Sequence, residues 1–265
     1  MCPRTTRLAG AFWPRLEPRV NKKLMIQAVL FDLDNTLLLN DMQTFMPGYF
    51  SLLSQHVPPS FEPDSFIQEV LYCTRIMMAD KNTAVSNRDT FWAALQERTN
   101  GDRDMLEAHF DAFYQDHFPQ LQNLTQSYSQ AAGLIHACFQ ANLKVVIATN
   151  PVYPRLAVEH RLAWAGVPVT SFAYDLVTDY GNMHTTKPHL AYYEEILTKI
   201  GCPPERALMV GDNWENDIVP AAKLGLFTYW INLKGEEPPE PEIVTEHGSF
   251  EQLYTLITAG WLQPD

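Results

Sequence analysis

The sequence predicts an α/β protein with a parallel sheet and with helices on both faces of that sheet. Three observations lead to this prediction. Short apolar segments that end in polar residues recur along the chain, helical patterns separate them, and one long stretch near the N-terminus carries only helical patterns. Alternating buried strands and helices are typical of a parallel sheet that is covered on both faces.

The strongest strand signals are three short apolar runs. They span residues 26–31 (IQAVLF), 144–149 (KVVIAT) and 207–212 (ALMVGD), and residues 171–177 and 226–231 are weaker versions. Runs of this length with β-branched members indicate buried strands.

Helical patterns fill the intervals between these runs. They cover residues 131–142, 153–167, 188–201 and 216–225, and residues 242–258 are expected to add a short strand and a closing helix. In the third of these segments Pro188 lies in the first turn and Gly201 at the end, which is typical of helix termini. Together these segments predict a three-layer, Rossmann-like parallel sheet core.

Residues 41–124 interrupt the alternation, because they contain four helical segments and no strand pattern. We expect them to form an inserted helical domain, with residues 25–40 and 125–265 as the core. Residues 1–24 contain three prolines and no regular period. We expect a flexible leader or a start codon placed too far upstream there, with a targeting peptide as a third reading.

The composition of the chain narrows the range of possible partners and locations. The formal net charge is −12, which argues against nucleic acid and anionic membranes as partners because both require clustered basic residues. No apolar run reaches the roughly 18 residues that span a bilayer. The four cysteines are widely spaced and form no CxxC pair, so we expect reduced thiols and a cytoplasmic location. The oligomeric state cannot be inferred from the sequence.

Several polar side chains stand at or near the ends of the predicted strands. In open α/β sheets the carboxyl ends of the strands meet at one edge, where ligands bind. The residues expected there are Asp32, Asp34, Thr149, Asn150, Lys187, Asp212 and Asp217.

Four carboxylates in one crevice repel one another unless a cation is present or their pKa values rise. Oxygen ligands of this kind suit Mg²⁺. With Lys187 and the Thr149 hydroxyl added, the site could hold a phosphate dianion that an aspartate attacks. Each residue also has an ordinary structural reading: Asp32 as a turn former, Asp217 as a helix cap and Lys187 as a surface lysine.

The motifs DLDNT (32–36), TN (149–150), KP (187–188) and GDNWEND (211–217) occur in this order on these elements. In this respect the chain resembles the haloacid dehalogenase superfamily of hydrolases over residues 25–40 and about 125–258. The resemblance implies that Asp32 is the nucleophile, forms an aspartyl-phosphate and contacts Mg²⁺. Asp34 would be the general acid and base, with its backbone carbonyl as a metal ligand.

The resemblance extends to the remaining motif residues. Thr149 and Asn150 would bind the phosphate, and Lys187 would offset charge between nucleophile and phosphate. Asp212 would bind the metal directly, and Asp217 would bind it through water or orient other groups. Residues 41–124 occupy the place of the helical cap, which in this superfamily closes over the site and selects substrates.

The leading hypothesis is a magnesium-dependent phosphohydrolase of a small phosphorylated metabolite. Asp34 argues against a dehalogenase, because dehalogenases of this superfamily lack an aspartate at that position. A phosphomutase and a non-catalytic binding protein of the same superfamily remain alternatives.

Further side chains are weaker candidates. Arg75, Asn87 and Arg88 could contact a substrate, although Arg88 is also explained as a solvent-exposed residue. Met77, Met78 and Trp92 are expected in the core. His184 and His189 flank Lys187 and could approach the site.

Overall fold

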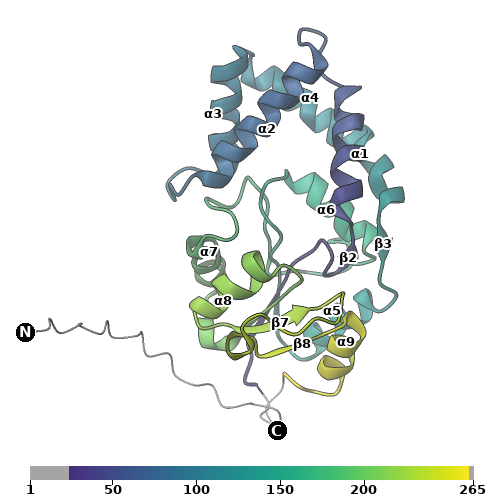
Figure 1. Cartoon of the computed structure of the whole chain (residues 1–265), viewed down its shortest axis with the longest axis vertical. Helices are drawn as coiled ribbons and strands as arrows, with labels where there is room; N and C mark the ends of the chain where they lie inside the picture. Colours follow the sequence, from purple (N-terminus) through teal and green to yellow (C-terminus); the bar gives the residue numbers. More distant parts are fainter. Residues whose placement is uncertain (1–23, 263–265) are drawn as a thin grey trace, which may run out of the picture.

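Residues 24–262 are described by a computed structural model (Figure 1). Its main sheet has six parallel strands in the order β5-β4-β1-β6-β7-β8. The strands are β1 (Ala28–Phe31), β4 (Lys144–Ile147), β5 (Leu176–Val177), β6 (Ala207–Gly211), β7 (Phe227–Ile231) and β8 (Glu246–Gly248). The parallel α/β core that the sequence predicts is therefore confirmed. The expected leader falls almost wholly on residues 1–23, which lie outside the described residues.

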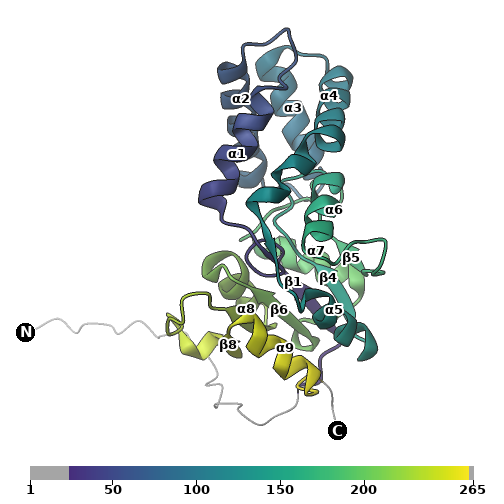
Figure 2. The ribbon, with the colours of Figure 1, turned by 90° about the vertical axis from the view of Figure 1, so that its right-hand side faces the viewer.

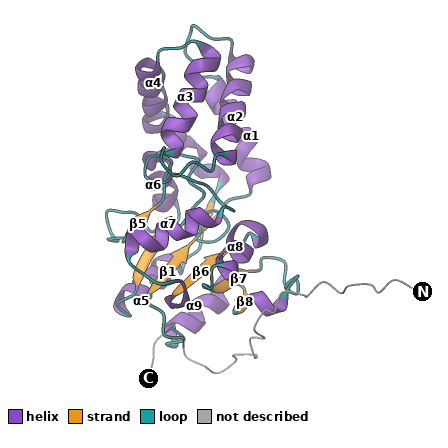
Figure 3. Ribbon diagram, turned by 90° about the vertical axis from the view of Figure 1, so that its left-hand side faces the viewer, coloured by secondary structure: helices purple, strands orange, loops and turns teal. Residues whose placement is uncertain are grey.

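Helices cover both faces of this sheet (Figure 3). Alternate residues of β1 serve the two faces, as the two-residue period of a strand requires. Val29 and Phe31 pack with α5 (Ala131–Gln140) and α9 (Phe250–Thr258), whereas Ala28 and Leu30 pack with α7 (Leu190–Ile200) and α8 (Val219–Lys223). The buried apolar run around β1 thus forms the centre of a three-layer core.

Four helices follow the first strand and group together at one end of the molecule, apart from the sheet (Figures 1 and 2). They are α1 (Met42–Ser54), α2 (Pro63–Ala79), α3 (Asn87–Thr99) and α4 (Arg103–Asp116), followed by a 3₁₀ segment, Phe118–Leu124. We call residues 42–124 the helical insertion. Two short strands, β2 (Leu38–Leu39) and β3 (Gln126–Ser127), pair antiparallel where the chain enters and leaves it.

Side chains satisfy the free N–H groups at the start of each insertion helix. Asp41, Glu62, Ser86 and Asp102 each accept a hydrogen bond from a backbone amide in the first turn that follows. Such caps typically contribute about 1 kcal/mol each. The Asp41 cap explains why α1 begins at Met42.

Three predicted elements differ from the structure. The strand expected at residues 171–177 is reduced to Leu176–Val177, because residues 168–174 form turns. The helix expected from Pro188 begins only at Leu190, since His189 still has an extended backbone. The helix expected at 216–225 is split into a π-helical segment, Trp214–Ile218, and the short α8.

The helical insertion contacts the core through aromatic rings and through one buried amide. The rings of Tyr49 and Tyr153 lie 5.7 Å apart, and those of Phe118 and Trp164 stack at 5.4 Å. The Asn87 side chain donates hydrogen bonds to core backbone carbonyls at both residue 151 and residue 185, each 3.2 Å long. Among residues 24–262, none of the helices has both the length and the apolar character needed to cross a bilayer.

Candidate active site

The site lies at the carboxyl edge of three adjacent strands. Asp32 follows β1, Thr149 follows β4 closely, and Asp212 follows β6. The register pairs Phe31 with Val210 of β6 and with Ile147 of β4. This register, together with the parallel direction of the strands, brings the residues that follow them to one edge of the sheet.

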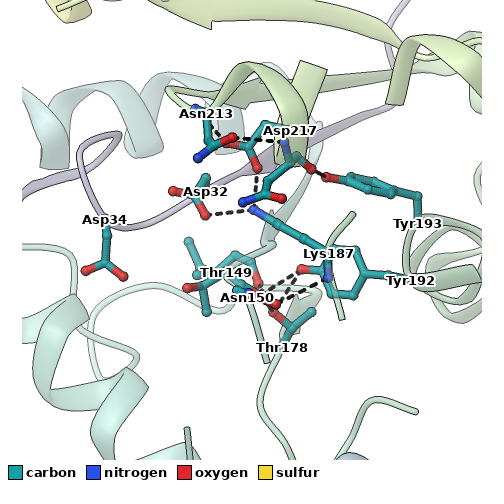
Figure 4. Close-up of polar contacts among 12 residues, drawn as sticks. Asp32, Asp34, Thr149, Asn150, Thr178, Lys187, Tyr192, Tyr193, Asn213 and Asp217 are labelled. Atoms are coloured by element: carbon teal, nitrogen blue, oxygen red, sulfur yellow. Dashed lines mark hydrogen bonds and ion pairs between the residues drawn. The ribbon is translucent and has the colours of Figure 1, made fainter. Parts of the chain in front are cut away.

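Three carboxylates gather at this edge. One side-chain oxygen from each of Asp32, Asp212 and Asp217 lies within 4.8 Å of the other two. The Lys187 ammonium group joins two of them: its Nζ lies 2.7 Å from Asp32 Oδ1 and 2.6 Å from Asp217 Oδ1 (Figure 4). Lys187 is 3% exposed, so the two ion pairs are shielded from water.

The pKa values at this edge reflect burial and mutual repulsion. Burial raises the pKa of Asp32 well above its ordinary value, with Lys187 opposing the shift and Asp217 adding to it. Burial and the neighbouring Asp217 raise the pKa of Asp212 to about 7. Burial opposes the charge on Lys187, but Asp217 and Asp32 outweigh it and raise the pKa of Lys187 well above its ordinary value.

Asp217 is held by the π-helical segment that carries it. The Asn213 backbone N–H donates to Asp217 Oδ2 at 3.1 Å, and the Asp217 backbone N–H donates to the Asn213 carbonyl at 2.8 Å. Gly211, at the end of β6, leaves room for this carboxylate: a β-carbon at that position would overlap the Asp217 side chain. Asp217 therefore faces the cluster rather than serving only as a helix cap.

The loop before α7 is tied to the end of β4. The Lys187 backbone N–H donates to Asn150 Oδ1 at 3.2 Å. The Thr149 carbonyl accepts hydrogen bonds from the Thr178 hydroxyl at 2.7 Å and from the Tyr192 hydroxyl at 2.8 Å (Figure 4). Asn150 thus supports the backbone of Lys187, a contact that the sequence did not predict.

The Asp34 carboxylate lies outside the carboxylate cluster, because it points away from Asp32 and Lys187 (Figure 4). Its Oδ2 lies 2.5 Å from Arg161 Nη1, and its Oδ1 accepts a hydrogen bond from Asn40 Nδ2 at 2.8 Å. Arg161 belongs to α6 (Arg155–Trp164) and is 2% exposed.

Sequence reasoning missed Arg161 and Asn40, although one signal for Arg161 exists. The arginine falls between Val158 and Leu162, two apolar positions of the same helical pattern. An arginine on the apolar face of a helix is rarely buried without a charged partner.

The weaker candidates have other partners. Met77 and Trp92 are buried in the core as expected, whereas Met78 is only partly buried. Asn87 bonds to core backbone, and Arg88 forms an ion pair with Glu107. The guanidinium carbon of Arg75 lies 5.9 Å from the centre of the Tyr72 ring. His184 pairs with Glu195, and His189 Nε2 contacts the Met78 carbonyl.

The carboxylate cluster suits a divalent cation with oxygen ligands. Three carboxylates carry more negative charge than one lysine balances, and hard oxygen donors are those that Mg²⁺ prefers. The Asp34 side chain is outside this group, so any contribution of Asp34 to a metal would come from its backbone carbonyl.

Comparison with known proteins identifies the family. The model of the haloacid dehalogenase-like hydrolases matches residues 26–225. The pyrophosphatase PpaX of Bacillus cereus (strain AH820) is 26% identical over 214 residues, which cover 80% of this chain and 87% of that protein. A phosphoserine phosphatase of Thermus thermophilus is 30% identical over 115 residues, 43% of this chain and 44% of that protein.

Solved structures show the same fold. A 2-haloacid dehalogenase from Pseudomonas syringae pv. Tomato DC3000 has a TM-score of 0.59 at 18% identity and covers 89% of this chain and 100% of its own. A phosphatase from Thermococcus onnurineus has a TM-score of 0.53 at 18% identity, with 88% and 98% covered. The family match spans most of the sequence and includes all four motifs, so this chain belongs to the haloacid dehalogenase-like hydrolases.

Proposed function

We propose that this chain is a magnesium-dependent phosphohydrolase that acts on a small phosphorylated metabolite through an aspartyl-phosphate on Asp32. The observation that carries the proposal is the cluster at the sheet edge. A buried aspartate stands 2.7 Å from a buried lysine, with two further carboxylates close by. This combination supplies a nucleophile, a positive charge for a phosphate group and oxygen ligands for a cation.

The first step forms a covalent intermediate. An oxygen of the Asp32 carboxylate attacks the phosphorus atom, and the bond from phosphorus to the leaving oxygen breaks. Asp34 gives its proton to that oxygen, so the leaving group departs as an alcohol. Lys187 balances the charge that develops between Asp32 and the phosphate oxygens.

The second step restores the enzyme. Asp34, now a carboxylate, takes a proton from a water molecule as the water oxygen attacks the phosphorus atom. The bond from phosphorus to Asp32 breaks, phosphate leaves and the Asp32 carboxylate is regenerated. We assign the binding of the phosphate oxygens to Thr149 and Asn150, next to Lys187.

Asp32, Asp212 and Asp217, with the Asp34 carbonyl, would hold the magnesium ion. When bound, the ion would neutralise the phosphate oxygens and help to align them for in-line transfer.

Phosphate chemistry is favoured over dehalogenation by Asp34. Solved dehalogenases share the fold, so the fold alone does not separate the two chemistries. Expulsion of a halide requires no proton, whereas an alkoxide leaving group does. The two relatives named above support the same choice, since they are a pyrophosphatase and a phosphoserine phosphatase.

We further propose that the helical insertion acts as a cap that selects the substrate, with residues 25–40 and 125–265 as the catalytic core. Its position after the first strand supports this reading, as do its contacts with the loops around Pro151 and Thr185. We also propose a cytoplasmic location, which is supported by the free, buried thiols of Cys73, Cys138 and Cys202.

The test is phosphate release by purified protein with Mg²⁺. The panel should include p-nitrophenyl phosphate, phosphorylated sugars, phosphorylated hydroxy acids, phosphoserine and inorganic pyrophosphate. We expect release from at least one compound, its abolition in Asp32→Asn and its suppression by EDTA. Wild-type protein that is inert on the whole panel would contradict the proposal, and transfer of phosphate between two positions of one sugar would indicate a phosphomutase instead.

A further inference from the structure

The Asp34 carboxylate is held at both oxygens by groups outside the carboxylate cluster. Arg161 Nη1 lies 2.5 Å from Oδ2, and Asn40 Nδ2 lies 2.8 Å from Oδ1. Two donors on opposite oxygens fix the plane of a carboxylate as well as its position. Each oxygen still has a second lone pair, so proton transfer to a substrate or from a water molecule remains possible.

Arg161 is itself firmly held. Its Nε donates to the Ala157 carbonyl at 3.3 Å, and its guanidinium carbon lies 4.7 Å from the centre of the Tyr153 ring. Tyr153 in turn contacts Tyr49 of the helical insertion, with ring centres 5.7 Å apart. The arginine therefore connects Asp34 to the seam between the core and the insertion.

Stability alone gives a poor reason for this arrangement. Arg161 is 2% exposed, and its Nη2 is buried without an acceptor among the described residues. A buried ion pair is often no more stabilising than apolar residues of the same volume, and an unsatisfied buried donor is unfavourable. A leucine or methionine would fill the same face of α6 without either penalty.

We propose that Arg161 is a positioning residue for the reaction: it fixes the Asp34 carboxylate on the side away from Asp32, where in-line attack by Asp32 would place the leaving oxygen of the substrate. This inference rests on the proposed phosphohydrolase function. It adds a residue from α6 to the machinery, outside the four motifs that define the site. The guanidinium explains why arginine serves here, because one nitrogen is anchored on the Ala157 carbonyl while another bonds Asp34, so the direction of the contact is fixed as well as its charge.

The test compares two substrates of nearly equal size, phenyl phosphate and p-nitrophenyl phosphate. Phenolate is a much poorer leaving group than p-nitrophenolate, so its departure depends more on a well-placed proton donor. The parameter is kcat/KM with Mg²⁺, which reports on every step up to the departure of the leaving group. Asp34→Asn sets the reference: it should lower kcat/KM for phenyl phosphate by about 10²-fold or more, and for p-nitrophenyl phosphate much less.

Arg161→Met should also affect phenyl phosphate more than p-nitrophenyl phosphate, but less strongly than Asp34→Asn. We expect kcat/KM to fall by about tenfold on phenyl phosphate and by under about threefold on p-nitrophenyl phosphate. In the Asp34→Asn background the same substitution should add no further selective loss, because the arginine acts only through Asp34. Arg155→Met is the matched control, since Arg155 is on the same helix but pairs with Glu159 and leaves Asp34 untouched. It should keep both rates.

Equal losses on the two substrates, or a further selective loss in the double variant, would overturn the positioning role. If Arg161→Met does not fold, Arg161→Lys decides by the same ratio of losses on the two substrates. It keeps the charge but lacks the second nitrogen that bonds the Ala157 carbonyl, and an unchanged ratio would overturn the proposal. If the wild type is active and the Arg161 variant keeps the wild-type ratio of kcat/KM on the two substrates, this inference alone is refuted. Wild-type protein inert on both compounds and on the wider panel refutes the phosphohydrolase function and this inference with it.

Discussion

The backbone of Gly211 lies directly against the carboxylate of Asp217. Gly211 ends β6, and Asp217 reaches back over it from the π-helical segment to meet Lys187 at 2.6 Å. A β-carbon on Gly211 would occupy the space of the Asp217 side chain. The position of one member of the carboxylate cluster thus depends on the absence of a side chain six residues earlier.

Replacing Gly211 with alanine should therefore damage the site without removing a charged group. We expect Gly211→Ala to push Asp217 away from Lys187 and to lower kcat/KM by about tenfold to 100-fold, as misplacement of about 1 Å can do. The increase in melting temperature that Mg²⁺ produces should also shrink. Phosphate release and thermal unfolding with and without Mg²⁺ measure both effects. An unchanged rate and an unchanged response to Mg²⁺ would show that Asp217 tolerates the shift.

Lys187 should also be a stability determinant of the metal-free protein. Without it, Asp32 and Asp217 would be buried with no counter-charge, and removing one partner of a buried ion pair typically costs about 3–5 kcal/mol. We expect Lys187→Met to lower the free energy of unfolding by about this amount at pH 7.5. The loss should be smaller at pH 5.5, because the unpaired carboxylates can then take up protons.

Urea denaturation at the two pH values tests this expectation. Lys199→Met provides the control, since Lys199 pairs with Glu195 in a partly exposed position and such pairs contribute about 1 kcal/mol or less. Equal destabilisation by the two substitutions would mean that the buried lysine has no special role.

The strand ends were predictable from the sequence because local pattern determines them. An apolar run that stops at Asp32, and another that stops at Asp212, identify buried strands and the residues that leave them. Parallel pairing then brings the two aspartates to one edge, as the register of β1 and β6 shows. The fold class and the location of the cluster follow from features within a few residues of each strand.

The partner of Asp34 could not be predicted in this way. Arg161 is 127 residues further along the chain, and the contact depends on how α6 is rotated against the turn after β1. The π-helical segment that carries Asp217 could not be predicted either. Its start at Trp214 depends on a capping hydrogen bond that the Asn213 side-chain oxygen accepts from the Asn216 backbone N–H. The segment carries no apolar period of its own. Contacts of this kind arise from tertiary packing.

The response to Mg²⁺ should depend on pH through Asp212. Its pKa lies at about 7, mainly because of burial and then because of Asp217, whereas an unfolded aspartate titrates near about 3.9. In the metal-free protein the native state therefore binds the proton more tightly than the unfolded state. The contribution of Asp212 to the free energy of unfolding is therefore fully present below about pH 3.9 and is lost as the pH rises through about 7.

At low pH Mg²⁺ must displace the proton on Asp212 in order to bind, whereas at high pH the carboxylate is already charged. We expect millimolar Mg²⁺ to raise the melting temperature more at pH 8 than at pH 6, by mass action on the native state. Thermal unfolding over a Mg²⁺ titration at both pH values measures the difference, and Asp212→Asn should largely remove it. Equal shifts at the two pH values in the wild type would contradict a protonated Asp212.

Asn87 should couple the helical insertion to the core. Its side chain is buried at the start of α3 and donates to the carbonyls of Pro151 and Thr185, while its backbone N–H donates to the Met183 carbonyl at 2.8 Å. Asn87→Ala would leave two buried carbonyls without this donor. We expect the free energy of unfolding to fall by about 1–3 kcal/mol.

The same substitution should also reduce activity, because Thr185 is only two residues from Lys187 in the loop that the amide holds. We expect a higher KM for p-nitrophenyl phosphate, with a smaller change in kcat. Asn82→Ala is the matched control: Asn82 is exposed in the loop that precedes α3, and its loss should change stability by no more than about 0.5 kcal/mol. If Asn87→Ala and Asn82→Ala behave alike in urea denaturation and in steady-state kinetics, the amide contact does not couple the insertion to the site.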